Sequence, residues 1–254
     1  MLLMTESKVV LPGKEQFKET SASSFLLLLL VADFAFISLH FLLAMTPTLN
    51  SPLYSLGTDR GYAEFYQYVK ELWIIVLLLS ICVKTRAVGY IAWAMLFGYL
   101  LGDDALQVHE TFGSYIATRL SFVPLLGLRA QDFGELAVSA MSGALLLTLL
   151  AWFYVRGSDA FKQSTKHLLL LLLLVAFFGI FVDMLHTALK MGRTVNFLLG
   201  VVEDGGEMIA MSFVAWYVFL LNVREGNLGF SLRSLVDAAL TRRSTRTGQK
   251  RPAG

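Results

Sequence analysis

The sequence predicts an all-α integral membrane protein: a polytopic bundle of six transmembrane helices, with its N- and C-termini in the cytoplasm. Three observations favour this class. Hydrophobic residues make up 56% of the 254 residues, and the mean hydropathy is +0.63. Only 16% are charged, against about a quarter in soluble domains. Continuous Leu-rich runs such as 25–43 reach the ~18 residues of a spanning helix, and their lack of alternation argues against a β-barrel.

Hydrophobic periodicity and turn signals place the six spans along the chain. The first apolar run exceeds the ~7–15 residues of a signal-peptide core, so we expect it to remain as an uncleaved span. The predicted spans cover about 24–46, 63–84, 88–114, 134–155, 167–189 and 200–222. A cytoplasmic segment, 1–23, precedes this transmembrane domain of 24–222, and a basic cytoplasmic tail, 223–254, follows it.

The distribution of Lys and Arg sets the expected orientation. With both ends inside, fifteen of the 21 basic residues fall in inner segments. The six in outer segments are Arg60, Lys70, Arg119, Arg129, Lys190 and Arg193. Positive charge concentrates on the cytoplasmic side of membrane proteins. We therefore expect a multi-pass protein of the cell membrane, of the bacterial inner membrane type, with its outer helix ends on the periplasmic or extracellular side.

Acidic residues gather at that outer end of the predicted bundle. Ionisable groups at membrane depth are costly and rare unless something pairs with them. Eleven of the nineteen carboxylates fall there: Glu64, Glu71, Asp103, Asp104, Glu110, Asp132, Glu135, Asp183, Glu203, Asp204 and Glu207. The helix dipole explains acids in a first helical turn, but it disfavours Asp103 and Asp183 near helix ends, so something positive should face those two.

Helical spacing groups several of these acids on shared faces with histidine. Asp183 and His186 are three residues apart, and Glu203 and Glu207 are four apart. Carboxylates from facing helices with an acid-x-x-His motif build the di-metal sites of helical bundles. The predicted metal ligands are Asp103, His109, Glu110, Glu135, Asp183, His186 and Glu207, and the predicted catalytic acids and bases are Asp104, Glu203 and Asp204.

The chemistry of this set favours a divalent metal: iron, manganese or zinc, bound through oxygen and imidazole. The single cysteine, Cys82, excludes an intrachain disulfide and a multi-thiolate zinc site. The sequence thus predicts an outward-facing carboxylate and histidine site, mononuclear or dinuclear. It would support redox or hydrolytic chemistry on a lipid, quinone or other membrane-associated substrate. The expected partner is the lipid bilayer, and no nucleic acid is expected.

Two stretches of the sequence resemble each other. Residues 97–103 parallel residues 178–183, a histidine follows each, and Gly134-Glu135 matches Gly206-Glu207. A parallel internal repeat would deliver two equivalent sets of ligands. The match is short and differs by one residue, so a chance coincidence in Leu-rich helices stays open.

Three other functions remain open at this level. A proton- or cation-coupled transporter would also use acids and histidines in the membrane, although the predicted site lies at one end rather than at the midplane. A haem-binding subunit would need two histidines from His40, His109 and His186. A non-catalytic membrane subunit would use the acids in a structural ion-pair network. Asp33, near the middle of the first span, is expected either to pair with a neighbouring helix or to indicate that the first span is shifted along the sequence.

Overall fold

The computed structural model describes residues 12–46, 51–189 and 192–224, and all regular structure in these residues is helical. The helices, with η2 a π-helical stretch, are α1 Pro12–Met45, η1 Pro52–Tyr54, α2 Tyr62–Thr85, α3 Gly89–Leu106, α4 Val108–Arg119, α5 Ala130–Arg156, α6 Asp159–Ala176, η2 Phe177–Val182, α7 Asp183–Ala188 and α8 Arg193–Val223. The all-α prediction is confirmed. The predicted basic tail beyond residue 224 and the first part of the N-terminal segment lie outside the described residues.

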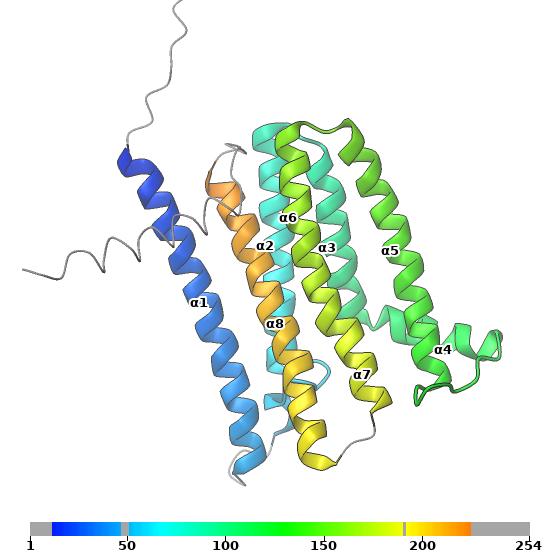
Figure 1. Cartoon of the computed structure of the whole chain (residues 1–254). Coiled ribbons are helices and arrows are strands. Elements are labelled where there is room, and N and C mark those ends of the chain that lie inside the picture. Colours follow the sequence, from blue (N-terminus) through cyan, green and yellow to red (C-terminus); the bar gives the residue numbers. More distant parts are fainter. Residues whose placement is uncertain (1–11, 47–50, 190–191, 225–254) are drawn as a thin grey trace, which may run out of the picture.

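The long helices run alternately up and down one bundle (Figure 1). α1 lies at one edge against α8, and α8 also contacts α2, α6, η2 and α7. α6, η2 and α7 form one nearly continuous helical run. The start of α1 and the end of α8 lie at the same end of the bundle (Figure 1).

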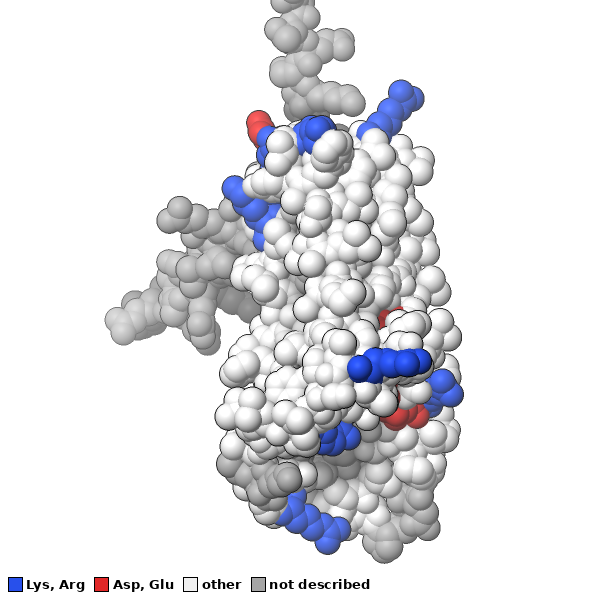
Figure 2. Space-filling model, turned by 90° about the vertical axis from the view of Figure 1, so that its right-hand side faces the viewer, with Lys and Arg blue, Asp and Glu red and all other residues white. Residues whose placement is uncertain are grey.

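Among the described residues, four helical runs are long and apolar enough to cross a membrane: Glu19–Met45, Ala130–Arg156, Asp159–Ala188 and Arg193–Val223. The first three bury little of their surface inside the bundle, as expected for helices that face lipid. One face of the molecule has a broad uncharged stretch in its upper half, between charged residues at the top and a second group of charged residues that begins near mid-height (Figure 2). The chain is therefore of the multi-pass membrane type. α2 and α3 are not among these runs.

The helix expected over 88–114 is wrong in extent, because it breaks at Gln107. This residue has left-handed backbone angles (φ 53°, ψ 47°), which end α3 and turn the chain into α4. The backbone N–H of His109 then donates to the Asp103 carboxylate at 2.7 Å, which satisfies the start of α4. The outer part of the expected third span is thus a separate helix that crosses the end of the bundle (Figure 1).

Two other helices begin earlier than expected. α6 begins at Asp159, not near 167, because the Ser158 hydroxyl caps it by accepting a hydrogen bond from the Phe161 N–H at 3.3 Å. α8 begins at Arg193, not near 200, directly after Gly192. Its acids therefore lie two to four turns inside a helix of 31 residues, rather than in its first turn.

The apolar core fills the half of the bundle where the α1 start and the α8 end lie. Large aromatic side chains dominate it, and α8 supplies a stripe of small and branched residues. Its fully or nearly fully buried members include Ile74, Leu78, Tyr90, Trp93, Phe97, Phe161, Leu168, Val214, Ala215, Tyr217 and Val218. This core fixes the positions of α2, α3, α6 and α8, and so aligns the polar residues in the other half of the same helices.

Candidate functional site

A Lys–Asp ion pair occupies the interior of the bundle between α1, α2 and α8. The Lys70 Nζ lies 3.2 Å from the Asp33 Oδ1, and both side chains are 0% exposed. The same ammonium donates to the Met208 carbonyl oxygen at 2.7 Å and to the Ser212 hydroxyl at 3.3 Å. Asp33 lies near the middle of its candidate span. This central pair, Asp33 and Lys70, confirms the expectation that Asp33 finds a partner on a neighbouring helix.

The central pair is not fully satisfied by hydrogen bonds. The second oxygen of Asp33 is buried and receives no hydrogen bond from the described residues. Lys70 also stands over the ring of Tyr66, with its Nζ 4.6 Å from the ring centroid. Lys70 thus holds Asp33 through one of its two carboxylate oxygens.

A group of three acids lies next to the central pair. This acid triplet consists of Glu71 on α2, Asp104 at the end of α3 and Glu207 on α8. Glu71 interacts electrostatically with both of the others, and its carboxyl group faces that of Asp104. Glu207 interacts with Asp104 and Asp204, and Lys70 lies within electrostatic range of both glutamates.

The acid triplet lacks enough donors for three ionised carboxylates. Glu71 is 0% exposed, and neither of its oxygens receives a hydrogen bond from the described residues. Two facing carboxylates can form a hydrogen bond only if one of them carries a proton, because an ionised carboxylate has no donor. Like charges held this close disfavour full ionisation. The arrangement therefore calls for a shared proton or a bound cation.

A third group, the outer cluster, lies nearer the start of α8. It consists of Asp183 and His186 on α7 and Glu203 on α8. The His186 Nδ1 lies 2.6 Å from the Glu203 Oε2, and Asp183 interacts electrostatically with Glu203, Glu135 and Asp132. The structure thus joins the Asp-x-x-His motif to α8, through Glu203 rather than through Glu207.

The remaining predicted residues have local partners. The His109 Nδ1 lies 3.0 Å from the Asp103 Oδ2, so the positive group expected opposite Asp103 comes from the next helix. This contact with Asp103 raises the pKa of His109 to about 9, against the opposing effect of burial. Glu135 accepts from the Gln131 Nε2 at 2.7 Å, and Glu110 adds negative charge beside His109.

The predicted single ligand set is thus spread over three neighbouring places. Asp183 and His186 belong to the outer cluster, Glu207 to the acid triplet, and Asp103, His109 and Glu110 to the corner between α3 and α4. Of the predicted catalytic residues, Glu203 joins the outer cluster, Asp104 joins the triplet, and Asp204 lies over Gly57. Within the described residues, no group of three or more His, Cys, Asp or Glu side chains is arranged to hold a metal ion.

Along α8 the groups form a line that leads inward. Glu203 and Glu207 share one face, Asp204, Met208 and Ser212 share the adjacent one, and the distance from Glu203 to Ser212 along the axis is about 13 Å. Glu203 contacts the outer cluster, Glu207 belongs to the acid triplet, and Ser212 contacts the central pair. Beside this line, the Glu207 carboxylate lies against Gly179 in the π-helical η2.

Sequence reasoning missed two parts of this interior. Lys70 was assigned to an outer segment, because it stands with Glu64 and Glu71 before an apolar run. The second part is the inner pair, His167 and Tyr217, where the His167 Nδ1 lies 2.8 Å from the Tyr217 hydroxyl. The signal that points to Lys70 is its spacing: it lies four residues after Tyr66, on one helical face, and Tyr66 lines the same pocket as Asp33.

The three histidines considered for haem each have another partner. His40 accepts from the Leu56 N–H at 3.1 Å and stacks on Phe197, with ring centroids 4.9 Å apart. His109 pairs with Asp103 and His186 with Glu203. The structure therefore offers no argument for a pair of axial histidine ligands among these three.

Comparison with known proteins gives a family but no activity. No curated protein matches the chain, and no solved structure matches it. One family model, a domain of unknown function designated DUF8692, matches residues 22–223, which include every helix from α2 to α8 and most of α1. The chain belongs to the DUF8692 family.

Proposed function

We propose that this protein is a proton- or cation-coupled membrane transporter in which the line of ionisable groups along α8 leads to the central pair. The observation that carries the proposal is the state of that pair. Asp33 and Lys70 are 0% exposed at mid-span, yet one Asp33 oxygen and both Glu71 oxygens have no donor in the described residues. Intramembrane acids and lysines of this kind form proton relays and ion pathways.

A purely structural ion pair accounts less well for the arrangement. A pair that only joins helices is expected to have its remaining oxygens satisfied, because each unsatisfied buried polar group is destabilising. Here the unsatisfied oxygens lie next to more carboxylates, and Lys70 is shared between the central pair and the acid triplet. A proton or cation that enters the triplet reduces the negative charge around Lys70 and so changes the attraction that holds Lys70 to Asp33.

The sidedness of the proposal follows from the helix order. We infer that α2 and α3 also cross the bilayer, which gives six spans with both termini in the cytoplasm. Lys70 is buried and so does not count as an outer loop cation, which strengthens the positive-inside bias. The outer cluster then faces the periplasm or the extracellular medium of a cell membrane, and cations enter from that side.

A metal-dependent membrane enzyme is the second candidate function, and the contact between His186 and Glu203 favours it. A divalent metal (iron, manganese or zinc) would draw Asp183, His186, Glu203 and Glu135 together at the outer end, with Asp204 as a general base. The substrate would be a lipid or a quinone in the outer leaflet. Metal analysis of detergent-purified protein tests this directly: stoichiometric metal that is lost in His186→Ala supports it.

The transporter proposal is tested by proton flux in proteoliposomes. The reconstituted protein, with a pH-sensitive dye inside the vesicles, is driven by a potassium diffusion potential. We expect internal acidification with the native chain, and flux at the level of protein-free vesicles with Asp33→Asn and with Glu207→Gln. Asp59→Asn, which changes an exposed loop acid bonded to Gln107, is the matched control and should retain flux.

Two results would count against the proposal. If the native protein carries no protons, and no sodium or potassium ions in the same assay, the proposed transport function is wrong. Flux that persists in folded Asp33→Asn and Glu207→Gln would show that ions pass elsewhere. Glu207→Gln keeps the side-chain size and leaves the close ion pair between Lys70 and Asp33 in place, so it tests the site even if Asp33→Asn fails to fold.

A further inference from the structure

We propose that α4 lies in the headgroup region of the outer leaflet, with one flank against lipid and the other toward water. This inference does not depend on transport, and only its assignment to the outer leaflet rests on the sidedness proposed above. α4 joins the end of α3 at Leu106 to the start of α5 at Ala130 through a turn, and it runs across the end of the bundle (Figure 1). Because α5 is a candidate span that starts there, the connection lies at the level of the bilayer surface.

One face of α4 is occupied by α5. Gly113 and Ala117 are buried, and Gly113 lies directly on the backbone of α5 at Gly134 and Glu135. A Cβ added at Gly134 would lie 2.0 Å from the Gly113 carbonyl oxygen, so the two helices cross in backbone contact. This contact fixes the rotation of α4 about its own axis, and so determines where its other flanks point.

The two flanks on either side of the buried face differ in chemistry. One carries Phe112 and Tyr115, whose side chains are 56% and 58% exposed. The other carries Thr111, Ser114 and Thr118, all exposed. A helix with an apolar flank and a polar flank, lying parallel to the membrane surface, is the form of an interfacial helix.

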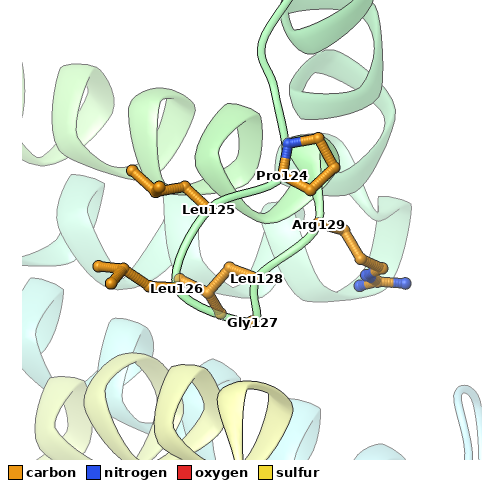
Figure 3. Close-up of a pocket in the computed structure, with 6 residues that line it drawn as sticks. All are labelled: Pro124, Leu125, Leu126, Gly127, Leu128 and Arg129. Atoms are coloured by element: carbon orange, nitrogen blue, oxygen red, sulfur yellow. The ribbon is translucent and has the colours of Figure 1, made fainter.

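Neighbouring residues extend the apolar flank and add positive charge. Leu106, Leu120 and Val123 are exposed apolar residues before and after α4. In the turn that follows, the side chains of Leu125 and Leu126 point to one side, away from the guanidinium of Arg129 (Figure 3). The Arg119 guanidinium lies 5.2 Å from the centroid of the Tyr115 ring.

This combination identifies lipid as the occupant of the apolar flank. Aromatic residues and arginine are enriched where a protein meets lipid headgroups. An Arg next to Tyr on the same flank can reach lipid phosphate, while the ring and the adjacent leucines contact the upper acyl chains. The adjoining candidate span α5 also carries exposed apolar residues, among them Leu136 and Met141.

Site-directed spin labelling tests the proposal. In a Cys82→Ala background, single nitroxides are placed through Phe112→Cys and Tyr115→Cys on the apolar flank, and through Ser114→Cys and Thr118→Cys on the polar flank. The full chain is reconstituted in vesicles of phosphatidylcholine and phosphatidylglycerol. We expect the labels at 112 and 115 to collide more with oxygen, and the labels at 114 and 118 to collide more with a water-soluble nickel chelate.

Equal accessibility at the four positions, or the reverse pattern, would overturn the proposal. Spin–spin broadening at 112 and 115 that disappears on dilution with unlabelled protein would also overturn it, because a second copy of the chain would then cover the flank. All four positions are exposed, and the two polar positions serve as internal controls on the same helix, so a difference between flanks does not depend on the overall fold.

Discussion

The outer half of α8, which begins at Arg193, and its inner half, which ends at Val223, have the same helical geometry but contact different kinds of side chains. The outer half presents Glu203, Asp204 and Glu207 to other ionisable groups from α2, α3 and α7. The inner half presents Val214 and Val218, both 0% exposed, to an apolar core. α2 contacts both halves, whereas α7 contacts the outer half and α6 contacts the inner half.

The two halves also differ in the kind of polar group they bury. In the inner half, the His167 Nδ1 lies 2.8 Å from the Tyr217 hydroxyl, and the buried atoms without a partner in the described residues are uncharged, the Tyr90 hydroxyl and the Trp216 indole nitrogen. In the outer half, Asp33 and Glu71 keep buried oxygens without donors. Stability is therefore expected to come mainly from the apolar core of the inner half, and the buried carboxylates of the outer half are expected to reduce it.

The largest expected effect is at the central pair. Asp33→Leu leaves the Lys70 ammonium buried without its carboxylate, and breaking a buried pair in this way costs about 3–5 kcal/mol. We expect Asp33→Leu to lower the unfolding temperature strongly in detergent. Asp33→Leu with Lys70→Leu should recover most of the loss, because it removes both charges. A single variant as stable as the native protein would show that the pair does not join α1 to the bundle.

The next largest effect is expected where α4 and α5 cross in backbone contact, a contact in the outer half that involves no charge. Gly134→Ala places a methyl group on the Gly113 backbone, and forcing the helices apart is expected to cost about 1–3 kcal/mol. Gly143→Ala, also on α5, is the control: nothing lies within 4 Å of its added Cβ, so a gain of up to about 1 kcal/mol is expected. Equal unfolding temperatures for the two variants would contradict the close crossing of α4 and α5.

The contrast between the two halves explains which parts of the structure the sequence could predict. Apolar runs predict helices because length and hydropathy suffice, and α2, expected over 63–84, is found at Tyr62–Thr85. The break at Gln107 was not predictable from composition, because no Gly or Pro marks it. Its signal is chemical: Asp103 is placed to accept from the His109 backbone N–H and to pair with its ring.

The sequence predicts which residues belong to the candidate site, but not which of them contact one another. Spacing on a single helix placed Asp183 with His186 and Glu203 with Glu207. Which of these meet depends on how the helices are shifted along one another, and α8 begins a full two turns earlier than its polar pattern suggested. That shift joins His186 to Glu203 and moves Glu207 inward to Glu71, so the same residues form a line instead of one cluster.

A smaller effect is expected in the inner half. Tyr217→Phe removes the hydroxyl that lies 2.8 Å from the His167 ring, and loss of one neutral hydrogen bond costs about 0.5–1.5 kcal/mol, with a larger loss if His167 stays unpaired. The matched control is Tyr62→Phe, at an exposed ring, with no expected change. Measured by thermal unfolding, a loss as large as that of Asp33→Leu would contradict the division between a charged outer half and a neutral inner half.

The smallest expected effect concerns a charged pair at the end of the bundle, Asp103 and His109. The pKa of His109 is raised from 6.5 to about 9. A raised pKa in the folded state means that the charged pair stabilises the protein fully below pH 6.5, and that this contribution is lost as the pH rises through about 9. His109 is partly exposed, so screening by solvent limits the loss to a few degrees in unfolding temperature.

Other groups also titrate in this range, and His109→Gln isolates the contribution of the pair. The unfolding temperature of this variant should fall less between pH 7 and pH 10 than that of the native chain. If the two curves stay parallel, the imidazole is neutral in the folded protein, and α4 is held at the bundle end by its crossing with α5 and by the Asp103 cap of its backbone.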